Sequence, residues 1–414
     1  MKPLAGLREG FPVTFAGWSL LALAGAAFWF QGVGRLDLVL LAASVLAALL
    51  VAGLCVATVA AALVLRRRAG GGQGRMSLEC GAWNATGFRV PLSRWLPFLR
   101  VRVAWEAPGD IQADLRLPSG LEHVLPRRRA LAPSVTRTVR VGDILGLTET
   151  GWRAAEASAA RILPERALLD PGAVLSGLVQ GEDQPDPRGG PQGDRVDIRK
   201  YGHGDPLRMI LWKVYARTRK AFVRVPERAL EPAPRVCAYL PASPWDEPPA
   251  RLARTLLERG LLGPGWRFGA DGAEDAEDLD RALEALAKSG SAGGAGGFPA
   301  FLERARRDGF GACILLLPGR DGPWVAAAQA ALAAAPLRIH AVFALDGWRE
   351  PAPSRWRRAF LRPAPSGGAA PDEVLDLLGR LVLPHMEATL VDTRSGDVLV
   401  QPQAYLRKLA GRPA

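Results

Sequence analysis

The stretch LVLLAASVLAALLVAGLCVATVAAALVL, residues 38–65, contains no charged side chain. A second uncharged stretch, FPVTFAGWSLLALAGAAFWF, precedes it at residues 11–30. Each stretch reaches the roughly 20 residues that a helix needs to cross the hydrocarbon core of a bilayer. Soluble core helices have no need to be apolar on every side. The sequence therefore predicts a hairpin of two transmembrane helices over residues 1–68.

A cleaved signal peptide is the alternative for the first stretch. Its apolar part is longer than the roughly 7–15 residues that are typical of a signal peptide core. A second apolar stretch also follows at once, without an obvious cleavage site. These two features favour a membrane span.

The charges beside the two stretches predict the topology. Lys2 and Arg8 precede the first stretch, and three arginines at 66–68 follow the second. The connecting loop, QGVGRLD, holds one Arg and one Asp. Because Lys and Arg are retained on the cytoplasmic side, both ends of the hairpin are expected inside. We therefore expect a multi-pass protein of the inner (cytoplasmic) membrane with its soluble body in the cytoplasm.

The formal net charge of +12 is concentrated behind the second stretch. Residues 66–140 contain 14 Arg against five acidic residues. Nucleic acid is one possible partner for such a basic surface, and an anionic membrane leaflet is another. Since this segment directly follows a predicted span, we expect membrane lipid, and no nucleic acid, as its partner.

The soluble body divides into two parts of different pattern. Residues 76–180 contain short runs such as LRVRVAW (99–105), IQADLRL (111–117) and VTRTVRV (135–141), in which apolar and polar residues alternate. Alternation with a period of two is typical of half-exposed antiparallel strands. A small β-sandwich is therefore expected in residues 76–180. A loop rich in Pro and Gly is expected at 180–194.

Residues 235–400 contain buried-type strands that alternate with helices. The apolar runs lie at 236–240, 312–317 and 339–345, and the helix-like stretches at 249–260, 278–288, 299–308, 323–335 and 372–383. Continuous apolar strands that alternate with helices predict an α/β domain with a parallel sheet.

The segment GDRVDIRKYGHGDPLRMILWKVYARTRKAFVRVPE, residues 193–227, carries the most distinctive pattern. Asp205 followed by Pro206 is typical of a helix start. Apolar residues then recur at helical spacing from Leu207 to Tyr215, which predicts one short helix, and a strand is expected at 221–225.

This segment resembles the signature of the family known as domain of unknown function 58. The residues that match at the family's spacings are Arg199, Tyr201, Gly204, Asp205, Arg208, Ile210, Trp212, Lys213, Ala216, Arg217 and Arg224, with Glu227 as a closing acid. Upstream, VGDILGLTE (141–149) is similar to the family's Asp-x-x-Gly-Leu element. The order of spans, β-rich segment, signature (193–231) and α/β domain also fits the family.

The resemblance implies that the C-terminal domain is similar to a von Willebrand factor A fold, a doubly wound α/β domain. Such domains often hold Mg²⁺ through an Asp-x-Ser-x-Ser loop after the first strand, where hard oxygen ligands suit the ion. Here VCAYL runs into PASPWDEPP, which offers only Ser243, with Asp246 further along. Asp321, after the strand CILLL, could supply a later ligand but cannot hold an ion alone. We therefore expect a degenerate metal site and no cofactor, Mg²⁺ included.

The sequence offers no recognisable catalytic constellation. The four His, at 123, 203, 340 and 385, are scattered, and neither HExxH nor Gly-x-Ser-x-Gly occurs. The four Cys lack the paired spacing of a zinc site or a disulfide framework. We expect no enzymatic activity and no catalytic residues.

The cations of the signature allow two interpretations. Arg side chains suit carboxylates or phosphates of a partner, but they could equally brace the junction of two domains. We expect the brace, with Trp212 packed at the junction.

The function expected from these features is that of a membrane-anchored, non-enzymatic adaptor. The resemblance implies a MoxR-type AAA ATPase and a transglutaminase-like membrane protein as partners, in assembly or in a chaperone-like activity. The alternatives are a metal-dependent ligand-binding or adhesion module and a hydrolase with an unrecognised site.

Overall fold

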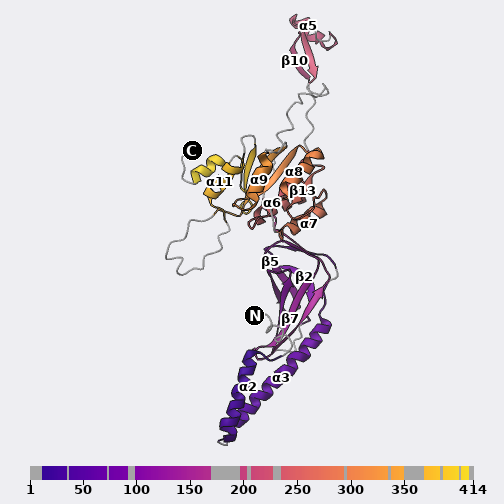
Figure 1. Ribbon diagram of the computed structural model, residues 1–414. Helices are drawn as coiled ribbons and strands as arrows, with labels where there is room; N and C mark the ends of the chain where they lie inside the picture. The colour runs from indigo at the N-terminus through magenta and orange to yellow at the C-terminus, as the bar shows by residue number, and fades with distance from the viewer. Residues whose placement is uncertain are drawn as a thin grey trace. The chain divides into compact units, whose positions relative to one another are not determined.

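The computed structural model describes most of the chain (Figure 1). The described residues are 12–34, 37–71, 74–91, 98–168, 196–202, 207–226, 235–292, 296–333, 337–348, 368–382, 386–400 and 402–409. They form two compact units: a first unit of Met1–Arg166 with Asp280–Gly293, and a second unit of Ala167–Leu279 with Gly294–Ala414. The loop predicted at 180–194 lies outside the described residues.

The first unit begins with a pair of apolar helices that lie side by side (Figure 1). The elements are α2 (Phe15–Ala27), the π-helix η1 (Phe28–Val33) that continues it, and α3 (Leu38–Arg68). Four of the five buried residues of α3 are seven positions apart: Ser44, Val51, Thr58 and Leu65. Spacing of seven keeps contacts on one seam of a helix, and small side chains at that seam allow two helices to approach closely.

Among the described residues, α3 is the one helix long and apolar enough to cross a membrane. It has 31 residues, and its most apolar window has a mean hydropathy of 2.8. Its outward side chains are large and apolar: Leu46 is 69% exposed and Val56 is 70% exposed. The predicted membrane helix over residues 38–65 therefore has the required length and composition. The second span stays a prediction, because α2 is shorter.

The described residues of the first unit also form nine strands: β1 (Met76–Glu79), β2 (Asn84–Arg89), β3 (Leu99–Ala107), β4 (Ile111–Arg116), β5 (Leu121–Pro126), β6 (Ala130–Ala132), β7 (Val135–Asp143), β8 (Glu149–Glu156) and β9 (Ala160–Leu163). They form three three-stranded sheets, β1-β9-β6, β2-β5-β4 and β3-β7-β8. All pairs are antiparallel except β1 with β9. The strands predicted at 99–105, 111–117 and 135–141 are confirmed as β3, β4 and β7.

The C-terminal end of α3 packs into the core of these sheets. Ala61 and Leu65 are buried in the same cluster as Phe88 of β2 and Val139 and Val141 of β7. Alternation along β7 buries every second side chain from Val135 to Val141, and Val139 and Val141 belong to this core. The apolar seam of the helix therefore continues directly into the β-sheet core.

The second unit contains a six-stranded sheet with the order β13-β12-β14-β15-β16-β17. The strands are β12 (Val236–Leu240), β13 (Arg267–Ala270), β14 (Ala312–Pro318), β15 (Arg338–Leu345), β16 (Glu387–Asp392) and β17 (Val398–Val400). Neighbours are parallel except for β17, which is antiparallel to β16. Strands 236–240, 312–317 and 339–345 were predicted from continuous apolar runs, and all three are confirmed.

Helices cover both faces of this sheet. The helices are α6 (Glu247–Glu258), α8 (Phe298–Arg307), α9 (Trp324–Ala333), α11 (Pro371–Leu381) and α12 (Gln403–Leu409). Side chains of α8, α9 and α11 share one core with alternate residues of β12, β14 and β15, and α6 packs against β14 and β15 from the other face. The predicted α/β domain with a parallel sheet is confirmed at this level. Helix α7 (Leu279–Ser289) was also predicted, but its residues from Asp280 onward group with the first unit.

The signature segment folds as a small hairpin. Its elements are β10 (Val196–Lys200), the 3₁₀-helix η3 (Leu207–Met209), α5 (Trp212–Thr218) and β11 (Phe222–Pro226), with β10 antiparallel to β11. The single helix predicted across residues 207–215 is wrong. Ile210 forms a bridge with Val223, and the Leu211 N–H donates to the Phe222 carbonyl over 2.9 Å. Pairing with β11 therefore interrupts the helix and buries Ile210 against Val223.

Candidate functional site

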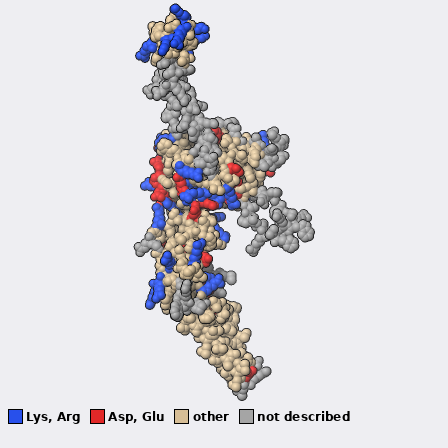
Figure 2. Space-filling view, turned by 180° about the vertical axis from the view of Figure 1, so that it is seen from behind, with Lys and Arg blue, Asp and Glu red and all other residues tan. Residues whose placement is uncertain are grey.

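The described part of the signature carries a high density of cations. Residues 196–202 and 207–226 contain one acid, Asp197, and eight Lys or Arg, at 199, 200, 208, 213, 217, 219, 220 and 224. The space-filling view shows blue side chains over much of this hairpin (Figure 2). Gly204, Asp205 and Glu227 lie outside the described residues, and the side chain of Arg224 is not described. The remaining cations could meet an acidic surface or a group of phosphates.

Helix α5 combines these cations with exposed aromatic side chains. Trp212 is 59% exposed and Tyr215 is 37% exposed. Their ring centroids lie 6.0 Å apart in an edge-to-face arrangement, and Lys213 and Arg217 are exposed on the same helix. This set is suited to contacts with another molecule, since aromatic and Arg side chains dominate binding energy at interfaces.

Trp212 is not buried within the hairpin itself, and its place at a domain junction stays a prediction. The two strands of the hairpin cover Ile210, which is 9% exposed, but they leave Trp212 in solvent. A two-stranded sheet has too little surface to bury both sides of a helix of seven residues. Tyr201 follows β10 at the end of the ladder next to α5, where its N–H donates to the Ala221 carbonyl over 3.0 Å. Arg199 and Arg208 are exposed on β10 and η3.

The second candidate site is the carboxyl edge of the parallel sheet. Strand order reverses between β12 and β14, and ligands of doubly wound sheets bind at such a switch point. Ser243 and Asp246 follow β12, and Asp321 follows β14, so the topology brings the three predicted metal candidates to this edge. The Asp246 carboxylate is buried and accepts from the Ser243 N–H over 3.1 Å.

Asp321 has partners of its own at this edge. Its Oδ2 accepts from Arg380 over 2.6 Å, and its Oδ1 accepts from the Gly322 N–H over 2.7 Å. The hydrogen bond from Arg380 holds the pKa of the Asp321 carboxyl below its ordinary value. Among the described residues, no group of three or more His, Cys, Asp or Glu side chains is arranged to hold a metal ion.

Asp271 organises the same edge, although it was not among the predicted site residues. This carboxylate is 3% exposed and accepts hydrogen bonds from the Tyr239 hydroxyl (2.8 Å), the Ala242 N–H (2.7 Å) and the Gly297 N–H (2.8 Å). Burial, together with the Asp271 charge, raises the pKa of Tyr239 far above its ordinary value. Asp271 therefore fixes the loop after β12 and the start of α8. Its signal in the sequence was an Asp directly after the four-residue strand β13.

The histidines of the described chain serve structural roles where their contacts are defined. His340 on β15 is 3% exposed, with Nε2 2.8 Å from the Thr389 hydroxyl and Nδ1 3.3 Å from Glu387. Burial lowers the pKa of His340 despite the nearby Glu387 carboxylate. His203 and His385 lie outside the described residues. The possible nucleophile in these contacts is the Thr389 hydroxyl, and Thr389 is only 1% exposed.

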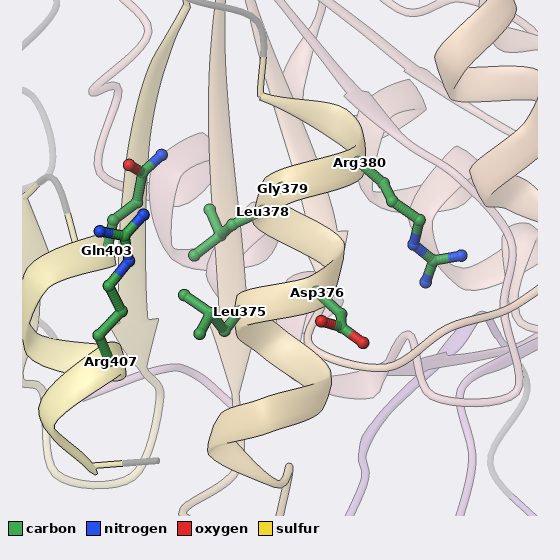
Figure 3. Close-up of a pocket in the computed structure, with 7 residues that line it drawn as sticks. All are labelled: Leu375, Asp376, Leu378, Gly379, Arg380, Gln403 and Arg407. Carbon is green, nitrogen blue, oxygen red and sulfur yellow. The ribbon is translucent and has the colours of Figure 1, made fainter. Parts of the chain in front are cut away.

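A third feature is an open cavity of about 790 Å³ beside α11 and α12 (Figure 3). Leu375 and Leu378 point from α11 toward α12, which contributes Gln403 and Arg407. Its lining side chains include no His, Cys, Ser or Lys among the residues that Figure 3 draws. The cavity could bind an extended apolar group, but its lining offers little for chemistry.

No family model matches the chain, and no curated protein or solved structure matches it. The resemblance to domain of unknown function 58 stays a prediction, carried by the residues between Arg199 and Glu227.

Proposed function

We propose that this chain is a membrane-anchored adaptor without enzymatic activity, which recruits a protein partner through the hairpin of residues 196–226. In this proposal α2 with η1 and α3 are two spans of the inner membrane, and the body lies in the cytoplasm. A MoxR-type AAA ATPase is the partner we propose, acting in assembly or as a chaperone. A transglutaminase-like membrane protein is a further partner of the same kind.

The observation that carries this proposal is the exposed aromatic and cationic surface of α5. Exposed Trp212 and Tyr215 beside Lys213 and Arg217 match the composition of interaction hot spots, where Trp, Tyr and Arg are enriched. The surplus of cations favours a partner with an acidic surface, because opposite charges steer association and set specificity. An adaptor needs such a surface and needs no catalytic group.

The helix pair supports the membrane anchor. Residues 38–65 are uncharged and are followed by three arginines at 66–68, which favour the cytoplasmic side. Figure 2 shows most of the length of the helix pair as a tan surface without blue side chains. The strand order β13-β12-β14-β15-β16 supports a doubly wound domain similar to von Willebrand factor A.

Affinity capture from detergent-solubilised membranes, with and without ATP, tests the proposal. We expect the parent chain to retain an AAA ATPase and the Trp212→Ala variant to lose it. Trp83→Ala is the matched control, because Trp83 is 48% exposed in the first unit. Equal capture by the parent and by Trp212→Ala would exclude the hairpin as the recruiting surface.

A further inference from the structure

The turn between β7 and β8 is a rigid structure built around Asp143. Its carboxylate accepts from the Leu147 N–H over 3.2 Å, from the Thr148 hydroxyl over 2.7 Å and from the Thr148 N–H. Gly146 has a φ of +73°, in the left-handed region that glycine adopts without strain. These contacts account for the Asp-x-x-Gly-Leu pattern at 143–147.

The rigid turn holds large apolar side chains in solvent. Ile144 is 58% exposed and Leu145 is 59% exposed. Phe98 is 64% exposed and joins them, because the Ile144 N–H donates to the Phe98 carbonyl over 2.9 Å. Single exposed apolar residues are ordinary, but three on two adjoining turns form an apolar tip. We call Phe98, Ile144 and Leu145 the apolar tip.

Hydrogen bonds attach the apolar tip to the start of the first apolar helix. The Thr14 N–H donates to the Leu147 carbonyl over 2.9 Å, and the Thr14 hydroxyl donates to the Gly146 carbonyl over 2.6 Å. Thr14 is also the N-cap of α2, and Phe15, the next residue, is 81% exposed. The apolar tip therefore lies at the level where α2 begins.

Exposed arginines follow the apolar tip along the neighbouring strands. Leu99 pairs with Asp143 at the end of the β3–β7 ladder, and the next outward-facing residues are Arg100 and Arg102 on β3. Arg140 on β7 is exposed directly opposite Arg102. Apolar side chains followed by arginines match the order of acyl chains and anionic headgroups at a membrane surface.

We propose that the apolar tip inserts into the boundary between acyl chains and headgroups, in the same bilayer that holds the helix pair. The inference rests on the proposed membrane anchor. Arg100, Arg102 and Arg140 then lie among anionic headgroups. With α3 packed into the sheet core and the apolar tip in the lipid, the first unit has two attachments to the bilayer. Two attachments fix the orientation of the first unit on the membrane surface.

Spin labelling of the full chain in nanodiscs of phosphatidylcholine and phosphatidylglycerol tests this proposal. The label is placed by Leu145→Cys in a Cys55→Ala background, since Cys80, Cys237 and Cys313 are buried. Oxygen concentrates in lipid and a nickel chelate in water. We expect the label at 145 to collide with oxygen more than with the chelate.

Two further positions make the outcome decisive. Trp83→Cys is the water-facing control, because Trp83 lies at the opposite end of the sheets from the apolar tip. The N–H of the nearby Gly81 donates to the Pro126 carbonyl, and Pro126 pairs with Ile111. Ile111 begins β4, directly after the turn at the end of β3 that is far from Leu99. Leu46→Cys on α3 reports on the anchor itself. If the label at 46 lies in lipid but the label at 145 is as accessible to the chelate as the label at 83, the insertion of the apolar tip alone is overturned. A label at 46 in water would overturn the membrane anchor and the insertion together.

Discussion

Gly17 of α2 lies directly against the carbonyl oxygen of Leu147: a Cβ added to Gly17 would be 2.3 Å from that oxygen. The same oxygen accepts the Thr14 N–H at the N-terminus of α2. The absence of a side chain at position 17 therefore allows the helix to rest on the turn between β7 and β8. This contact joins the apolar helix pair to the β-sheets at a defined point.

Gly17→Ala should separate α2 from this turn. No real Cβ comes so close to a carbonyl oxygen, so backbone must move, and overpacking of this kind costs about 1–3 kcal/mol. Thermal unfolding of the full chain in detergent micelles should show a lower melting temperature. Gly25→Ala is the matched control in the same helix, because its Cβ would meet nothing within 4 Å. Equal melting of the two variants would contradict the close contact.

The turn around Asp143 should lose stability in acid. Burial raises the pKa of this carboxyl, but hydrogen bonds from the Thr148 hydroxyl and from neighbouring N–H groups outweigh it and lower the pKa below its ordinary value. A lowered pKa in the folded state contributes stability above the unfolded value, about 3.9, and this stability is lost as pH falls through the folded pKa.

Asp143→Asn removes the negative charge and presents an NH₂ group to donors. We expect the variant to melt below the parent at pH 7. The difference should shrink as the pH falls below about 4, because the carboxyl of the unfolded parent then takes up a proton before that of the folded parent does. Melting curves of both proteins from pH 3 to pH 8 check this. A constant difference across the range would show that the charge of Asp143 contributes nothing.

Sequence patterns predicted the elements whose signal is local. Alternation identified β3, and continuous apolar runs identified β14. The helix expected from position 207 failed because Ile210 pairs with Val223, a contact that periodicity does not reveal. Asp271 was missed because its hydrogen-bond partners lie on other segments of the chain. The turn at Asp143 is joined to the first apolar helix by Thr14, which bonds to Leu147 across 133 positions of the sequence. Local patterns carry no record of such long-range hydrogen bonds.

A buried ion pair in the first unit should be sensitive to loss of either partner. Arg137 and Glu122 are both 0% exposed, with Nε donating to Oε2 over 2.9 Å. Glu122 also accepts from Trp105 Nε1 over 2.9 Å and from the Thr86 hydroxyl over 2.6 Å. Glu122→Ala should lower the free energy of unfolding by roughly 3 kcal/mol, because it leaves a buried cation with less compensation.

The control for this prediction is an exposed pair in the same unit. Arg153 Nε lies 3.3 Å from Glu106 Oε2, and the two side chains are 62% and 37% exposed. Glu106→Ala should change the free energy of unfolding by less than about 1 kcal/mol. Urea unfolding of the parent and both variants in detergent micelles compares the two pairs. Equal losses would mean that burial does not determine the strength of the Arg137–Glu122 pair.

The carboxyl edge of the parallel sheet should bind Mg²⁺ no more tightly than millimolar. Asp321 is held by Arg380, and Asp246 accepts from the loop backbone at Ser243. Binding of Mg²⁺ would have to displace these contacts and gather oxygen ligands from several loops. Isothermal titration calorimetry of the full chain with MgCl₂ measures the affinity. Micromolar binding that is lost in Asp321→Asn would establish a metal site here.

Substitutions in the exposed signature segment should reduce partner binding without reducing the stability of the chain. Because Trp212 is 59% exposed, truncation to Ala removes few packing contacts and should change the free energy of unfolding by no more than about 0.5 kcal/mol. Arg208→Ala, on the exposed 3₁₀-helix, should behave in the same way. Ile210→Ala is the opposite control, since Ile210 is buried against Val223. Melting curves and partner capture are measured for all three variants. If Trp212→Ala and Arg208→Ala keep the parent's melting temperature but lose partner capture, the segment is a binding surface. If the melting temperature falls together with capture, the segment is a structural brace.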